Sequence, residues 1–118
     1  MKIIHFGITE LKFRVILSAR SSKAIYEKGI ESIPSESACY PAKITHGHIE
    51  NLIEKGLHFI FYPSVAYERL ENEEAGNHYN CPVVASYPEV IKNNVDSLDH
   101  NDICFKNPFV SLNNPKTL

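Results

Sequence analysis

Three side chains that can bind metal or act as nucleophiles stand next to prolines in this chain. Cys39 lies two residues before Pro41, Ser64 directly follows a proline, and Cys81 directly precedes one. Pro41 predicts a helix start, because the first helical position does not need the N–H that proline lacks. A thiol at the amino end of a helix faces the positive pole of the helix dipole, which favours the metal-binding thiolate. Cys39 is therefore a candidate metal ligand, and the alternative is a small buried hydrophobic residue.

The histidines form no compact ligand set in the sequence. His46 and His48 lie two positions apart, so on a helix their side chains point to different faces. Cys39, His78 and Cys81 form a conceivable zinc site. The four-ligand spacing of zinc modules is missing, however, which favours surface or capping roles for these histidines.

Composition narrows the functional classes. The chain has 118 residues, the size of one domain, and its 43% hydrophobic and 22% charged residues are typical of a globular protein. Lys plus Arg (12) nearly balance Asp plus Glu (14) without a basic block, so we expect no nucleic-acid partner. No stretch approaches the ~20 apolar residues of a membrane span. Three widely spaced cysteines make no disulfide framework, so we expect a cytoplasmic protein with free thiols or ligands.

Helices and strands are predicted to alternate in the first half of the chain. Residues 13–18 are apolar and β-branched and predict a strand. Ser21 and Ser22 can then cap a helix that stops at Gly29. A second helix is expected from Pro41 to Gly56, followed at once by residues 57–62, which predict a strand buried on both faces of a parallel sheet.

The second half of the chain is harder to interpret from its pattern. Residues 68–80 are charged and lack periodicity, which predicts a long surface loop. Residues 82–86 predict a short strand and residues 87–93 a short helix. The residues from Asn94 onward are rich in loop-forming types, and we assign no elements to them.

This alternation predicts a three-layer α/β/α fold around a small, mostly parallel sheet. Ligands of such folds collect at the carboxyl ends of strands and the amino ends of helices. Ser64 follows the strand predicted at 57–62 and Cys39 precedes a helix, so both could face one crevice. If residues 82–86 are a parallel strand, Cys81 enters at the opposite edge. Either the long loop returns Cys81 to the crevice, or the ligand set is not assembled.

Three segments together resemble the 2-hydroxyacyl-CoA dehydratases and the large proteins related to their ATP-dependent activators. The segments are IPSESACYPAK at 33–43 with HGHI at 46–49, FIFYP at 59–63, and NHYNCP at 77–82 leading into SYPEVIKN at 86–93. The resemblance extends over roughly residues 13–94. It implies cysteines that hold a [4Fe-4S] cluster for electron transfer in acyl-CoA dehydration.

On that resemblance, the implied cluster ligands are Cys39, Cys81 and position 64, which is usually cysteine in the family and is Ser64 here. A serine alkoxide is harder to ionise and less soft than a thiolate, which weakens the site. Cys104 matches no ligand position. Lys43 and His46 are candidates to contact an anionic group such as a CoA phosphate, with solvated surface positions as the alternative.

The resemblance also implies partners and an incomplete sheet. The chain has no P-loop or other glycine-rich phosphate cradle, so an ATP-dependent step needs other domains or subunits of a dehydratase and activator system. Residues 1–12 are too short for the strand and helix with which the family domain begins. We therefore expect a single domain at 1–118 that is a fragment or short relative of a larger protein, not a complete catalyst by itself. Its open sheet edge favours a homodimer.

Two functional hypotheses follow from the sequence. The first is a domain that binds an iron-sulfur cluster through Cys39 and Cys81, with Ser64 in the third place, or that derives from such a domain. The second is a non-catalytic scaffold or interaction domain that keeps the fold without the cluster.

Overall fold

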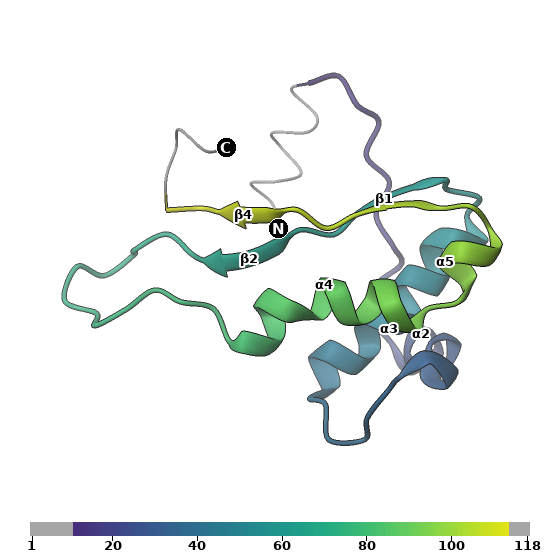
Figure 1. Cartoon of the computed structure of the whole chain (residues 1–118), viewed down its shortest axis with the longest axis horizontal. Coiled ribbons are helices and arrows are strands. Elements are labelled where there is room, and N and C mark those ends of the chain that lie inside the picture. The colour runs from purple at the N-terminus through teal and green to yellow at the C-terminus, as the bar shows by residue number, and fades with distance from the viewer. Residues whose placement is uncertain (1–10, 114–118) are drawn as a thin grey trace.

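The computed structural model describes residues 11–113, in which short helices and short parallel strands alternate (Figure 1). The elements are α2 (Lys23–Lys28), the 3-10 helix η1 (Ile30–Ser32), α3 (Tyr40–Glu54), β1 (Phe59–Phe61), β2 (Ser64–Tyr67), α4 (Pro82–Asn94), α5 (Ser97–His100), β3 (Cys104–Lys106) and β4 (Phe109–Ser111). The predicted α/β class and the parallel pairing of strands are confirmed. None of the helices within 11–113 is long and apolar enough to cross a membrane.

The first two predicted helices are confirmed, because local signals define their ends. The Ser22 hydroxyl accepts a hydrogen bond from the Ile25 N–H at 3.2 Å and caps α2, which ends at Gly29. Helix α3 begins one residue before Pro41. It crosses α2 at Gly47, where a Cβ atom would lie 1.7 Å from the carbonyl oxygen of Ile25. Only glycine allows this close approach of the two backbones.

The strand predicted at 13–18 is wrong, because these residues run as irregular chain without a strand partner in the described structure. Phe13 and Leu17 are 66% and 60% exposed. Polar bonds from α3 hold the end of the segment: Asn51 accepts from the Ala19 N–H at 2.8 Å, and Lys55 donates to the Leu17 carbonyl at 2.8 Å. β-forming residues make a strand only where a neighbouring strand and a packed surface receive them.

The two small sheets are one parallel ladder that prolines interrupt. β1 pairs with β3 and β2 pairs with β4, and the offset between partners is the same for the Phe59–Cys104 pair as for the Ser64–Phe109 pair. At that offset Pro63 stands opposite Pro108. Neither proline has an N–H to donate, so the ladder breaks where they meet.

The strand predicted at 57–62 exists as β1, but the prediction that both its faces are buried is wrong. Ile60 is 3% exposed, whereas Phe59 is 59% and Phe61 37% exposed. In the view of Figure 1 the helices lie below the strands, which is consistent with one covered face. On that face Ile60 packs with buried residues of α3, α4 and the start of α5, namely Ala42, Ile49, Tyr87, Ile91, Val95 and Leu98.

The strand predicted at 82–86 is wrong, because these residues are the first part of helix α4, which extends from Pro82 to Asn94. This helix includes the one predicted at 87–93. The short apolar run after Cys81 fits either a strand or a buried helix turn by periodicity, and its initial proline suits a helix start. The predicted loop at 68–80 is confirmed as irregular chain. The strand that precedes this loop, β2, was not predicted from the sequence.

Candidate functional site

Both candidate cysteines are the N-caps of the two longest helices of the described chain. Cys39 caps α3 and Cys81 caps α4, each with a proline among the next two residues. Both thiols are exposed, and neither makes a capping hydrogen bond. The backbone N–H groups in the first helical turns point toward these positions and favour negative charge there. Each thiol therefore lies at the positive end of a helix dipole.

Ser64, the third candidate, is buried at the start of β2. The residue is 1% exposed, and its backbone N–H donates to the Pro108 carbonyl at 2.9 Å. Its hydroxyl oxygen has no hydrogen-bond partner. A buried hydroxyl without a partner costs about 1–3 kcal/mol, so a ligand or a softer side chain fits this position better than an unbonded serine.

The long loop returns Cys81 to the strand that Ser64 begins. Asn80, the residue before Cys81, donates its backbone N–H to Ala66 at 2.9 Å and its side-chain amide to the Val65 carbonyl at 2.9 Å. Because residues 82–86 are helical, Cys81 does not enter at the far edge of the sheet. It begins a helix beside β2, and α4 packs along that strand.

Cys39 approaches the same region through Tyr87 of α4. Burial raises the pKa of Tyr87, and the nearby side chains of Tyr62 and Cys39 raise this pKa further. Helices α3 and α4, which carry the two cysteines, are also in direct contact.

A buried hydrogen-bond chain lies between these helices, and the sequence did not predict it. His46 is 0% exposed; its Nδ1 lies 2.7 Å from the Ser32 hydroxyl and its Nε2 3.0 Å from the Tyr87 hydroxyl. Burial lowers the pKa of His46 to about 4, so the ring is neutral at pH 7. The surface position expected for His46 is wrong. A polar residue within the apolar face around Ile44 and Ile49 was the only available signal.

His46 and His48 point to different faces of α3, as their spacing predicts. The two ring nitrogens of His48 lie 2.8 and 2.9 Å from the hydroxyls of Ser18 and Ser21, so this side chain tethers the segment before α2. Burial lowers the pKa of His48 as well. Both histidines have structural partners, and Lys43 donates to the Glu36 carbonyl at 3.4 Å, so a contact from Lys43 or His46 to an anionic group stays a prediction.

The described residues contain no group of three or more His, Cys, Asp or Glu side chains arranged to hold a metal ion. The zinc set of Cys39, His78 and Cys81 is therefore not assembled within 11–113. The candidate donors for a cluster are two thiols and the Ser64 hydroxyl, which is one thiolate short of the set expected from the sequence. Cys104 is an exposed thiol on β3.

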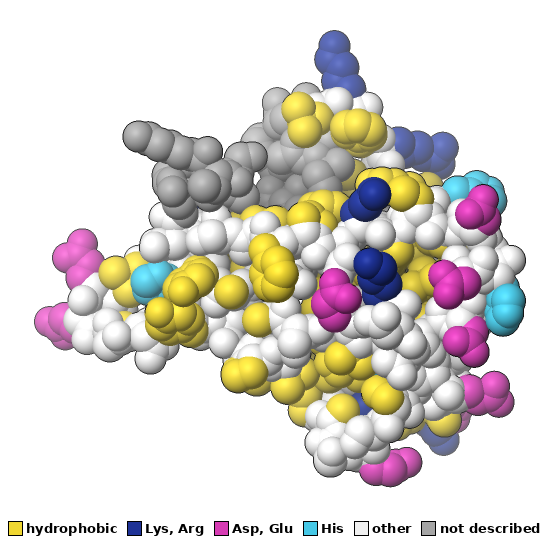
Figure 2. Space-filling view, in the orientation of Figure 1, with side chains coloured by type: hydrophobic (Ala, Val, Ile, Leu, Met, Phe, Trp, Pro, Cys, Tyr) yellow, Lys and Arg dark blue, Asp and Glu magenta, His cyan; other side chains and the backbone are white. Residues whose placement is uncertain are grey.

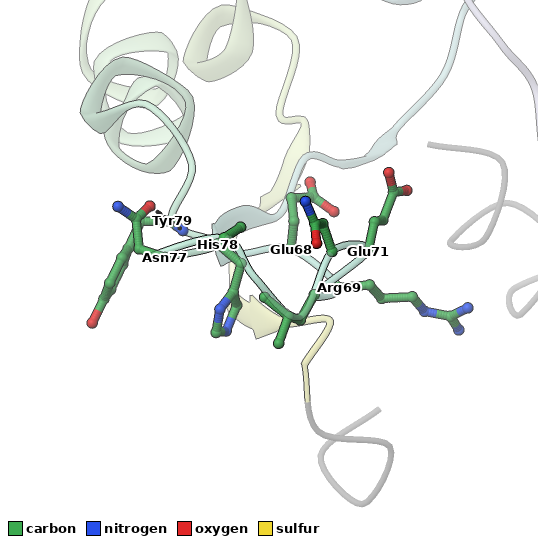
Figure 3. Close-up of a pocket in the computed structure, with 9 residues that line it drawn as sticks. Glu68, Arg69, Glu71, Asn77, His78 and Tyr79 are labelled. Carbon is green, nitrogen blue, oxygen red and sulfur yellow. Dashed lines mark hydrogen bonds between the residues drawn. The ribbon is translucent and has the colours of Figure 1, made fainter.

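A separate hollow of about 400 Å³ lies in the projecting loop between β2 and α4 (Figure 3). Its lining includes Glu68, Arg69, Glu71, His78 and Tyr79. Figure 3 shows the Arg69 side chain pointing away from His78 and Tyr79. No candidate cysteine lines this hollow, so it is distinct from the region of the two helix starts.

The fold and the paired cysteine caps define a small α/β domain with two thiols at helix amino ends. The family described as the CoA enzyme activase uncharacterised domain matches residues 2–118, and the chain belongs to this family. No curated protein and no solved structure matches the chain.

Proposed function

We propose that this chain is a cluster-binding domain of an acyl-CoA dehydratase and activator system. The observation that carries the proposal is the shared geometry of Cys39 and Cys81, each an exposed and unbonded thiol at the start of a long helix. Iron-sulfur clusters are held by cysteine thiolates, and both thiols are accessible to an incoming cluster. Ser64, which begins a strand that contacts α4 and has a buried hydroxyl without a partner, would supply the third ligand.

In this role Cys39 and Cys81 would be ligands of a [4Fe-4S] cluster, which supplies one-electron transfer when it is bound. Other domains or subunits of the system would supply ATP hydrolysis and the acyl-CoA site. A cytoplasmic location belongs to the same proposal.

Anaerobic reconstitution with iron and sulfide tests this function. Bound iron and the visible absorption spectrum are measured for the parent, Ser64→Cys, Cys39→Ala and Cys81→Ala, with Cys104→Ala as the matched control on β3. We expect a cluster in the parent, more in Ser64→Cys, the parent level in Cys104→Ala, and none in the other two variants. A cluster that survives loss of Cys39 or Cys81 would contradict the proposed ligands.

The second candidate is an interaction domain that lacks a cluster. Its support is the exposure of large apolar side chains, with Phe109 80% and Phe59 59% exposed on neighbouring strands. Figure 2 shows hydrophobic side chains spread across the face that carries the strands and α4. This function predicts colourless protein in every variant and self-association through the open strand edges. A monomer by light scattering at high concentration would count against the homodimer.

A further inference from the structure

The hydrogen-bond ladder of helix α4 has a break at Pro88, between the half that carries Cys81 and the second half of the helix. Pro88 lies inside the helix and is fully buried. It has no N–H to donate to the Val84 carbonyl, and its ring crowds the preceding turn. The ladder that joins residues 82–87 to residues 89–94 is therefore one hydrogen bond short, and side-chain contacts contribute to the angle between the two halves.

The side chain next to this break is bonded to α3. Tyr87 immediately precedes Pro88, is 5% exposed, and places its hydroxyl 3.0 Å from the His46 Nε2. The two rings meet edge to face at 84° with centroids 5.6 Å apart. The last residue of the cysteine-bearing half of α4 is thus attached to the centre of α3.

The hydrogen bonds of this chain are all satisfied by one arrangement. The Ser32 hydroxyl donates to the Gly29 carbonyl at 3.0 Å, which leaves its oxygen free to accept from the His46 Nδ1–H at 2.7 Å. The unprotonated Nε2 then accepts from the Tyr87 hydroxyl. A fully satisfied buried network rigidifies the side chains that it joins and specifies one arrangement of them. The chain therefore suits a positioning role.

Cys39 lies on the same side of α3 as this chain. Cys39 and His46 are seven residues apart, which is two helical turns. Ser32, at the other end of the chain, lies in η1, just before the loop that leads to Cys39. One buried connection therefore joins the approach to Cys39, the helix that it caps and the helix half that Cys81 caps.

We propose that Ser32, His46 and Tyr87 are positioning residues that hold the Cys39 and Cys81 helix starts at a fixed separation across the Pro88 break. The reason for a fixed separation, which is to present two ligands to a cluster, rests on the proposed function. The fixed separation itself can be tested without a cluster. The three side chains act through the helices that they join and do not contact the ligand.

Spin labels on Cys39 and Cys81 of the full chain, in a Cys104→Ala background, test the proposal without any cluster. Pulsed electron paramagnetic resonance measures the distribution of distances between the two labels. We expect one narrow distribution in the parent and a broader, shifted one in Tyr87→Phe, which removes only the hydroxyl. Tyr62→Phe is the matched control, because Tyr62 is not bonded to His46, and we expect it to keep the narrow distribution.

A second substitution that restores the missing backbone hydrogen bond of α4 should rescue the narrow distance distribution. A Tyr87 side chain that only stabilised the fold would not show this rescue. In Tyr87→Phe combined with Pro88→Ala, the N–H at position 88 can again bond to Val84, so the distribution should narrow. An unchanged distribution in Tyr87→Phe, or one that stays broad in the double variant, would overturn the proposal. Failure of cluster reconstitution would leave the distance result intact, so the two proposals fail separately.

Discussion

Helices α3 and α4 begin in the same way and are held in place in different ways. Each starts from an exposed cysteine with a proline in the first two helical positions. The centre of α3 contains Gly47, which lets the α2 backbone approach, and the buried His46. The centre of α4 contains Pro88, which interrupts the ladder. Cys39 is thus carried by a helix that packs closely against α2, whereas Cys81 is carried by a helix half that has one backbone bond fewer and that contacts β2 and, through Tyr87, α3.

This difference shows how one fold can hold two similar helix starts by different means. Close backbone packing fixes a helix at several points, because any movement creates overlap or a void. A single buried hydrogen bond fixes direction at one point and can be lost without unfolding the core. Substitutions in α3 should therefore act mainly on stability, and substitutions around Tyr87 mainly on geometry.

The largest effect is expected where α2 crosses α3. In Gly47→Ala the new Cβ atom would lie 1.7 Å from the Ile25 carbonyl oxygen, a backbone atom that cannot rotate away. The two helices must separate, and we expect the free energy of unfolding to fall by more than about 3 kcal/mol. Urea unfolding measures this loss. Gly76→Ala is the control, because no atom lies within 4 Å of its added Cβ. If Gly47→Ala left the free energy of unfolding nearly unchanged, α3 would not be held by close backbone packing, and the comparison with α4 would fail.

The buried histidine of α3 predicts a loss of stability in acid. Burial lowers the pKa of His46 from the ordinary 6.5 to about 4, so below pH 6.5 the unfolded chain binds a proton that the folded chain does not. The free energy of unfolding should therefore fall as the pH drops from 6.5 to 4, by up to about 3 kcal/mol from this group. The lowered pKa of His48 acts in the same direction.

Urea unfolding at a series of pH values measures this slope. His46→Gln should remove most of it, whereas His100→Gln, at the exposed end of α5, should leave it unchanged. A slope that His46→Gln preserves would assign the acid sensitivity to other groups. It would also weaken the description of His46 as the neutral centre of the chain that joins α3 to α4.

Sequence reasoning predicted what nearby residues determine. The start of α2 at Ser22 and the start of α3 near Pro41 depend on capping chemistry within a few residues, and both predictions are confirmed. Residues 13–18 and 82–86 were assigned to strands by composition. Their real states depend on whether a partner strand or an initial proline dominates, which a short apolar run does not reveal.

In the candidate site too, features that depend on nearby residues were predictable and features that depend on distant residues were not. The helix start at Cys39 was predictable from Pro41, while the equivalent start at Cys81 was hidden by the wrong strand assignment. The role of His46 was not predictable, because its partners Ser32 and Tyr87 lie 14 and 41 residues away in the chain. Whether Cys39, Cys81 and Ser64 bind a cluster stays a prediction.

The smallest expected effect is a gain in the free energy of unfolding when serine replaces the cysteine at either helix start. Cysteine caps a helix poorly, whereas serine can accept a hydrogen bond from the first-turn N–H groups, as Ser22 does at 3.2 Å in α2. Cys39→Ser and Cys81→Ser should therefore each raise the free energy of unfolding by about 0.5–1 kcal/mol. Cys104→Ser, which lies on a strand, should bring no such gain, and thermal unfolding distinguishes the three.

The gain should differ between the two helices in a way that sharpens their comparison. In α3, Pro41 is the second helical residue and leaves one fewer N–H to donate, whereas in α4 the second and third residues both keep theirs. Cys81→Ser should thus stabilise more than Cys39→Ser. If both variants gain stability and lose reconstituted iron, the thiols are kept at a cost in stability, as expected of ligands. If both lose stability, the cysteines serve packing, and the interaction-domain function becomes the better account.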